Sequence, residues 1–130
     1  MSVDKSRFVH HVGVTVDQAL PGHSRCSLQI QDFHRNPSGV VHGGAIFTLA
    51  DTAMGAALMA SLDEDFVCAT VEIRLAYFKP VFDGPLTCDA VIVNKGKTLA
   101  SMEASILIGS KLVSKASATF AIFKRRAVDP

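Results

Sequence analysis

The pattern of hydrophobic and polar residues predicts one long helix near the middle of the chain. Residues 43–60 read GGAIFTLADTAMGAALMA, and their alanine, leucine and methionine favour a helix. At about 100° per residue, the small and polar side chains of this segment fall on one stripe about 100° wide. The stripe comprises Gly44, Thr48, Asp51, Thr52, Gly55 and Met59. The other faces are apolar, so we expect the helix to be buried on almost every side.

After this segment the pattern changes to a period of two, which is typical of strands. We expect four strands, over residues 66–78, 86–94, 98–108 and 111–123, separated by turns at 79–85, 95–97 and 109–110. Short connections between consecutive strands predict an antiparallel meander.

The first of these strands alternates an apolar set of residues with a polar set. The apolar set, which we expect to face the helix, comprises Val67, Ala69, Val71, Ile73 and Leu75. The polar set comprises Cys68, Thr70, Glu72 and Arg74.

Before the long helix the pattern is weaker. Residues 2–10 predict a short helix, and residues 12–16 and 24–31 predict strands on either side of a turn at 20–22. A polar loop from Asp32 to Val41 follows. One helix that is apolar on most sides must be wrapped by a curved antiparallel sheet. We therefore predict an α+β fold in a single domain that covers residues 1–130.

Size and charge exclude several classes of protein. The chain has 130 residues, the size of one domain, and 13 Lys and Arg against 12 Asp and Glu, which argues against a nucleic-acid partner. Three scattered cysteines fit a reducing compartment, and the first residues hold no apolar run of signal-peptide length.

A membrane-spanning helix needs about 20 apolar residues, and Asp51 interrupts the only candidate. We expect a cytoplasmic protein without a membrane span. A chain this short buries a modest core, which favours oligomers.

Several familiar sites are missing from the sequence. It contains no G-x-S-x-G elbow, no Walker loop and no G-x-G-x-x-G motif. Its five histidines lack H-x-x-x-H spacing, and no cysteine pair has the spacing of zinc ligands. We therefore predict no metal and no cofactor.

Two features of the long helix are candidates for chemistry. His42, Gly43 and Gly44 open it, where free N–H groups and the positive end of the helix dipole can polarise a carbonyl oxygen. The two glycines could equally serve only to allow a tight entry into the helix. Asp51 lies in its middle, where a buried carboxylate costs several kcal/mol unless it is paired or functional. A structural Asp bonded to a neighbour, or facing solvent along the stripe, is the alternative.

The segment from Asn36 to Gly44, NPSGVVHGG, followed by Leu-Ala-Asp at 49–51, resembles the signature of hotdog-fold acyl-CoA thioesterases. It is most similar to the phenylacetic-acid-degradation (PaaI-like) branch. The resemblance covers nearly the whole chain, since the long helix, the strand end Tyr77–Pro80 and the last three strands come in the family's order. It implies hydrolysis of an acyl- or aryl-CoA thioester to a carboxylate and CoA, with CoA as part of the substrate rather than a cofactor.

The resemblance also implies roles for single residues. The amide of Gly43 polarises the thioester carbonyl, and Asn36 helps to hold the same carbonyl. Asp51 activates water or attacks the carbonyl carbon. Some members position the water with a strand Ser or Thr, for which Thr70 is the best match, although simple alternation turns it away from the helix. His42 is expected to orient the loop or the region of the sulfur.

The spacing of Gly43 and Asp51 bears on how a site is assembled. They are eight residues apart, which is about 12 Å along one helix, so one thioester carbon cannot lie within about 3 Å of both. Either they serve different purposes, or two chains with antiparallel helices build the site together. The second possibility agrees with the dimers of the family, whose sheets join edge to edge, so we expect a homodimer or homotetramer.

Other questions stay open at the level of the sequence. Lys79, Lys95, Lys97 and the basic cluster 124–126 lie at turns or ends where they could meet the CoA phosphates. A non-catalytic acyl-CoA-binding protein and a hotdog (de)hydratase are the alternatives to a thioesterase. Asp51 together with Asn36 argues against the first of them.

Overall fold

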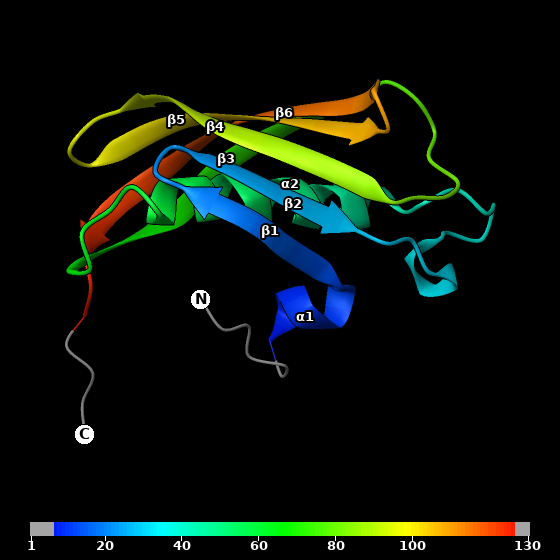
Figure 1. Ribbon diagram of the computed structural model, residues 1–130, viewed down its shortest axis with the longest axis horizontal. Coiled ribbons are helices and arrows are strands. Elements are labelled where there is room, and N and C mark those ends of the chain that lie inside the picture. The colour runs from blue at the N-terminus through cyan, green and yellow to red at the C-terminus, as the bar shows by residue number, and fades with distance from the viewer. Residues whose placement is uncertain (1–6, 127–130) are drawn as a thin grey trace.

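The computed structural model describes residues 7–126 and contains one long helix and six strands (Figure 1). The elements are α1 (Phe8–Val12), β1 (Val14–Leu20), β2 (His23–Leu28), the 3-10 turn η1 (Asp32–His34), α2 (Gly43–Met59), β3 (Phe66–Tyr77), β4 (Leu86–Lys95), β5 (Leu99–Ile108) and β6 (Lys111–Lys124). The predicted long helix is confirmed as α2. The helix predicted over 2–10 overlaps the short α1 at residues 8–10, and residues 2–6 of that prediction lie outside the described residues.

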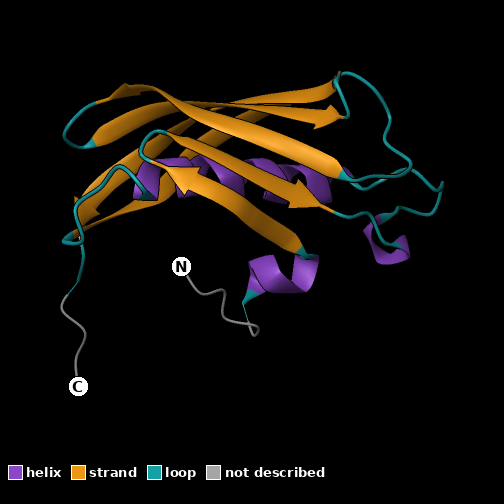
Figure 2. Cartoon of the chain, in the orientation of Figure 1, coloured by secondary structure: helices purple, strands orange, loops and turns teal. Residues whose placement is uncertain are grey.

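The strands form one antiparallel sheet in the order β1-β2-β4-β5-β6-β3, and α2 lies along its concave face (Figure 2). The predicted α+β architecture, one helix wrapped by an antiparallel sheet, is confirmed. The first hairpin is tighter than expected, because β1 continues to Leu20 and the chain reverses at Pro21 and Gly22, where Gly22 has a φ of 84°. The strand predicted over 24–31 ends at Leu28, and η1 occupies the start of the expected loop.

The predicted meander of four strands is wrong at its first connection. β4, β5 and β6 follow one another as neighbours, but β3 pairs with β6 at the far edge of the sheet. The connection from β3 to β4 is too long for a tight hairpin and contains Pro80 and Pro85. It instead runs beside the loop before α2, where the Val41 N–H donates to the Val81 carbonyl at 2.8 Å. Because β3 pairs with β6 and not with β4, it is an edge strand.

A bulge in β3 reverses which side chains face the helix. Thr70 pairs with Phe120 and Glu72 pairs with Thr119, so Val71 is the extra residue. Phe120 is buried, and Thr70 therefore points to the helix side of the sheet. The expectation that one apolar set faces the helix is wrong for its first three members, Val67, Ala69 and Val71. Inward-facing residues are even-numbered before the bulge and odd-numbered after it, because an inserted residue shifts the alternation by one.

The core lies between α2 and the sheet. Leu49 and Met54 of the helix are fully buried, and burial of such a side chain stabilises the fold by about 1.5–3 kcal/mol. The small and polar stripe predicted from the sequence is the least buried side of α2. Phe47, beside this stripe, is 38% exposed. In the described part of the chain no helix is long and apolar enough to cross a lipid bilayer.

Candidate active site

The first turn of α2 presents one free backbone donor. His42 is the N-cap residue, and its Nδ1 accepts the Gly44 N–H at 2.8 Å. The Ala45 N–H donates to the His42 carbonyl at 3.0 Å. Within residues 7–126 the Gly43 N–H donates to no group, so it remains available at the positive end of the helix dipole. This N–H has the chemical character needed to stabilise a negative charge on a carbonyl oxygen.

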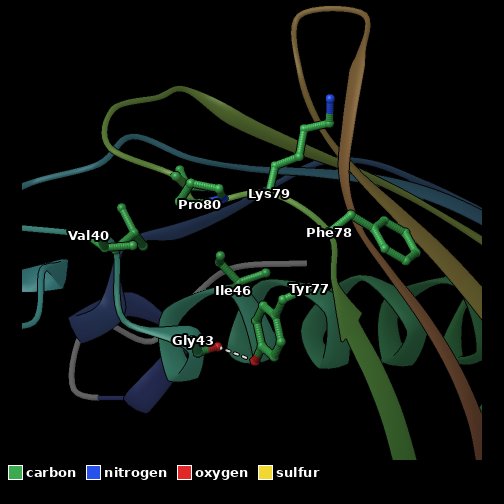
Figure 3. Close-up of a pocket in the computed structure, with 9 residues that line it drawn as sticks. Val40, Gly43, Ile46, Tyr77, Phe78, Lys79 and Pro80 are labelled. Atoms are coloured by element: carbon green, nitrogen blue, oxygen red, sulfur yellow. Dashed lines mark hydrogen bonds between the residues drawn. The ribbon is translucent and has the colours of Figure 1, made fainter.

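Tyr77, at the end of β3, contacts the same turn. Its hydroxyl donates to the Gly43 carbonyl at 2.7 Å (Figure 3). A Cβ atom on residue 43 would lie only 3.0 Å from the Tyr77 hydroxyl oxygen, so this close approach is a structural reason for glycine. Sequence reasoning noted Tyr77 only as part of a strand end. It faces α2 because of the bulge in β3, which simple alternation does not show.

A cavity of about 330 Å³ opens beside Gly43 and Tyr77. Its lining residues are Val40, Val41, Gly43, Ile46, Tyr77, Phe78, Lys79, Pro80 and Val81. In Figure 3 the Lys79 side chain extends away from α2, so the cavity is apolar near the helix and carries a positive charge at its edge.

Asp51 forms a hydrogen-bonded pair with Thr70. The Thr70 Oγ1 donates to the Asp51 Oδ1 at 2.7 Å, across the space between α2 and β3. The predicted outward orientation of Thr70 is therefore wrong, and the bulge at Val71 is the physical reason. Of the alternatives for Asp51, the structure shows a carboxylate that is bonded to a neighbour and lies on the less buried stripe.

Cys68 lies close to this pair on the same face of β3. Burial raises the pKa of the Cys68 thiol, and the negative charge of Asp51 raises it further. We therefore expect the pKa of the Cys68 thiol to respond to the charge on Asp51.

Asn36 has the local contacts of a turn residue. Its Oδ1 accepts the Ser38 N–H at 3.0 Å and the Ser38 hydroxyl at 2.6 Å. The carboxamide oxygen is thus engaged, and Nδ2 is the group that Asn36 could offer to a carbonyl.

Arg35, which sequence reasoning did not select, connects this loop to the β3–β4 connection. Its guanidinium donates to the Phe82 carbonyl at 3.0 Å and to Asp83 at 2.7 Å.

The candidate residues fall into two groups within one chain. Thr70 joins Asp51 in the middle of α2, whereas His42 and Gly43 lie at its first turn. About 12 Å of helix separates the two groups, as the eight-residue spacing requires. The structure therefore brings together the members of each group but does not bring the two groups to one point in a single chain.

A second cavity, of about 380 Å³, lies between α1, η1 and the first turns of α2. It is lined by Phe8, His11, Val12, Phe33, His34, His42, Gly44, Ala45 and Thr48, none of which is an Asp, Glu, Lys or Arg. The His34 ring joins two of the segments that line this cavity. Its Nδ1 accepts the Gln31 N–H at 2.8 Å, so its Nε2 donates to the Val12 carbonyl at 2.6 Å. Phe8 and Phe33 are both 68% exposed at its mouth.

Over residues 7–126, no group of three or more His, Cys, Asp or Glu side chains is arranged to hold a metal ion. The three cysteines are free thiols.

Comparison with known proteins identifies the family of this chain. The family model of the thioesterase superfamily matches residues 38–114, which include the His-Gly-Gly turn, Asp51 and Thr70. Acyl-coenzyme A thioesterase 13 of Mus musculus is 31% identical over 103 residues, or 78% of this chain and 71% of that protein.

Solved structures show the same fold. The conserved protein PA5202 from Pseudomonas aeruginosa is 34% identical with a TM-score of 0.86, over 89% of this chain and 93% of that one. A phenylacetic acid degradation-related protein from Ralstonia eutropha shares the fold with a TM-score of 0.81 at 23% identity, over 87% of each chain. The resemblance read from the sequence is thus confirmed at the level of the family: this chain is a hotdog-fold member of the thioesterase superfamily.

Proposed function

We propose that this protein hydrolyses an acyl-CoA thioester to a free carboxylate and CoA. The observation that carries the proposal is the Thr70–Asp51 hydrogen bond of 2.7 Å, because it places a hydroxyl and a carboxylate side by side on the least buried stripe of α2. A water molecule that donates to Asp51 and contacts the Thr70 oxygen would be held and deprotonated there. The free Gly43 N–H supplies the complementary group, a donor for the developing oxyanion.

The proposed reaction begins with the thioester carbonyl oxygen on the Gly43 N–H, with the Asn36 Nδ2 as a second donor. Asp51 takes a proton from water as the water attacks the carbonyl carbon, and the C–S bond then breaks to release the CoA thiolate, which is protonated. Asp51 could instead attack the carbon itself and form an anhydride that water opens. In a single turnover in ¹⁸O-labelled water, the general-base route places ¹⁸O only in the released carboxylate. The anhydride route places ¹⁸O in Asp51 when water attacks the Asp51 carbonyl of the anhydride, so label in Asp51 identifies that route.

We propose that each site is shared between two chains of a homodimer or a dimer-based tetramer. The separation of about 12 Å between Gly43 and Asp51 in one helix supports this, since a partner helix that runs antiparallel can bring its own Asp51 to Gly43. The edge strand β3 supports it as well, because within residues 7–126 this 12-residue strand pairs on one side only, and such an edge favours association.

The two cavities beside the first turn of α2 suggest how the substrate lies. A thioester carbonyl at Gly43 has an acyl group on one side and the CoA chain on the other. The cavity edged by Lys79 suits the phosphate-bearing CoA half, and the cavity walled by Phe8 and Phe33 suits an uncharged acyl group.

We expect the acyl group to be an aryl or arylacetyl group, from the resemblance to the PaaI-like branch. Three free cysteines fit a reducing cytoplasm as its location.

Release of free thiol from a panel of short-chain, long-chain, aryl and hydroxylated aryl CoA esters tests the proposal. We expect the wild-type protein to release thiol from at least one of these esters. Asp51→Asn keeps the side-chain shape but cannot take up the proton, so its turnover should be about 10²–10⁴-fold lower. Asp89→Asn is the matched control, since Asp89 pairs with Arg25 on the surface at 2.9 Å and should leave turnover unchanged. Binding without thiol release, or hydration of an enoyl-CoA instead, would contradict the proposed reaction.

A further inference from the structure

One peptide group at the start of α2 joins two side chains that are 35 residues apart in the sequence. The carbonyl of the Gly43–Gly44 peptide accepts the Tyr77 hydroxyl at 2.7 Å. The N–H of the same peptide donates to the His42 Nδ1 at 2.8 Å. The three groups therefore form a continuous chain of hydrogen bonds from the end of β3, through the helix backbone, to the imidazole of the N-cap residue.

This chain determines where the imidazole carries its proton. Because Nδ1 accepts the Gly44 N–H, the single proton of the neutral ring resides on Nε2, which becomes the donor that His42 can offer. A hydroxyl bonded to a peptide carbonyl polarises the peptide and makes its N–H a stronger donor. The Tyr77 hydroxyl thus strengthens the contact that selects the Nε2–H form of His42.

Tyr77 is well held for such a role. The Phe78 N–H donates to the Val113 carbonyl at 2.9 Å, and Tyr77 is paired with position 114 in the β3–β6 ladder, so backbone contacts fix the strand at Tyr77. Its hydroxyl also lies so near Gly43 that no Cβ would fit comfortably there. Burial raises the pKa of Tyr77 above its ordinary value, so the phenol remains a donor at neutral pH.

We infer that Tyr77 is a positioning residue of the thioesterase site. Through the Gly43–Gly44 peptide, its hydroxyl keeps His42 in the Nε2–H form and holds the first turn of α2 so that the Gly43 N–H stays in place for the thioester carbonyl. The inference rests on the proposed function for its effect on turnover, but the effect on His42 belongs to the folded protein alone.

The test uses two variants that each delete one hydroxyl oxygen at the same end of the sheet. Tyr77→Phe removes the donor to the Gly43 carbonyl and keeps the ring. Ser114→Ala, the control, removes the hydroxyl bond to the Ala76 carbonyl, which does not involve α2. The measurements are kcat and KM for thiol release, the melting temperature, and the ¹⁵N chemical shifts of the His42 ring, which report its tautomer.

For Tyr77→Phe we expect kcat to fall by about 10-fold, which is less than the roughly 10²–10³-fold typical of a lost direct oxyanion donor, with KM within about two-fold. The His42 ring nitrogens should shift toward a mixture of tautomers. Ser114→Ala should lower the melting temperature and leave kcat and the His42 shifts unchanged. A Tyr77→Phe protein with wild-type His42 shifts, or with wild-type kcat, would overturn the inference. If the wild-type protein hydrolyses no thioester, the proposed function fails, whereas the ¹⁵N shifts still decide the link from Tyr77 to His42.

Discussion

At the scale of single residues, the contact between Thr70 and Asp51 has a direct test. Thr70→Val keeps the shape of the side chain and loses the donor to Asp51, so kcat should fall by about 10-fold, less than the roughly 10²–10⁴-fold typical of the proton-accepting group itself. Thr70→Ser retains a hydroxyl and should recover most of the turnover. Thr119→Val is the matched control, because Thr119 lies on the outer face of the sheet opposite Glu72. Equal turnover in the Val and Ser variants at position 70 would show that the hydroxyl has no part in the reaction.

The thiol of Cys68 provides a second test, which needs no substrate. Burial raises the pKa of Cys68 first, and the charge of Asp51 adds to the rise. Asp51→Asn removes the charge and leaves the burial, so the pKa of Cys68 should fall but stay above its ordinary value. At a fixed pH below that pKa, more thiolate is then present and alkylation is faster, as site-resolved mass spectrometry would show.

Cys26 is the internal control for this experiment. Burial is the main cause that raises its pKa to about 11, and Asp51 is not among the causes, so its alkylation should be the same in both proteins. A Cys68 profile that does not move in Asp51→Asn would mean that residue 51 carries no charge near the thiol.

At the scale of elements, the sequence predicts those segments whose local signal is strong. The bounds of α2 and of the strands β4, β5 and β6 lie within about two residues of those predicted from the sequence. The signals that predict them, composition and hydrophobic period, are local. Two predictions for β3 were wrong: which of its side chains face α2, and which strand it pairs with, since it lies beside β6 rather than β4. The bulge at Val71 carries no glycine or proline to mark it, and strand order depends on contacts distant in the sequence.

The same distinction applies to the candidate site. Asn36, His42, Gly43 and Asp51 were selected because they lie within 16 consecutive positions that carry the motif, from the loop before α2 to the middle of that helix. Tyr77 and Arg35 were missed, because each acts through a contact to a distant backbone carbonyl, which no local pattern encodes.

Two α2 helices in the proposed dimer should cross at a defined residue. If Gly43 of one chain meets Asp51 of the other, two-fold symmetry places position 47, midway between them, against its own counterpart. Phe47 is 38% exposed beside the least buried stripe of α2, which fits an apolar contact at the axis. Phe47→Cys should therefore form a disulfide between chains under mild oxidation.

Leu112→Cys is the control for this experiment, since Leu112 has the same exposed fraction of 38% but lies on β6, away from α2. It should stay mainly monomeric on a non-reducing gel. Equal crosslinking of both variants, or none at position 47, would contradict the antiparallel pairing of the helices.

At the scale of the whole molecule, one chain holds all the proposed groups but keeps them in two places. The carboxylate and hydroxyl lie midway along α2, and the free N–H lies at its first turn. Thr70 belongs to β3, the last strand of the sheet, which among the described residues pairs with β6 alone. In the proposed dimer, a site with both groups exists only when two chains associate, so in this proposal the dimer is part of the chemistry rather than an addition to it.

Complementation between two impaired variants tests this central claim most directly. Asp51→Ala and Asn36→Ala are each purified and assayed, and then co-expressed. If one chain supplies Asn36 and Gly43 and the other supplies Asp51, a mixed dimer has one site with both lesions and one site with neither. Random pairing makes half of the dimers mixed, so about a quarter of all sites should be wild type and turnover should rise to that order. A mixture that demonstrably exchanges subunits and yet remains as inactive as the separate variants would contradict the shared site.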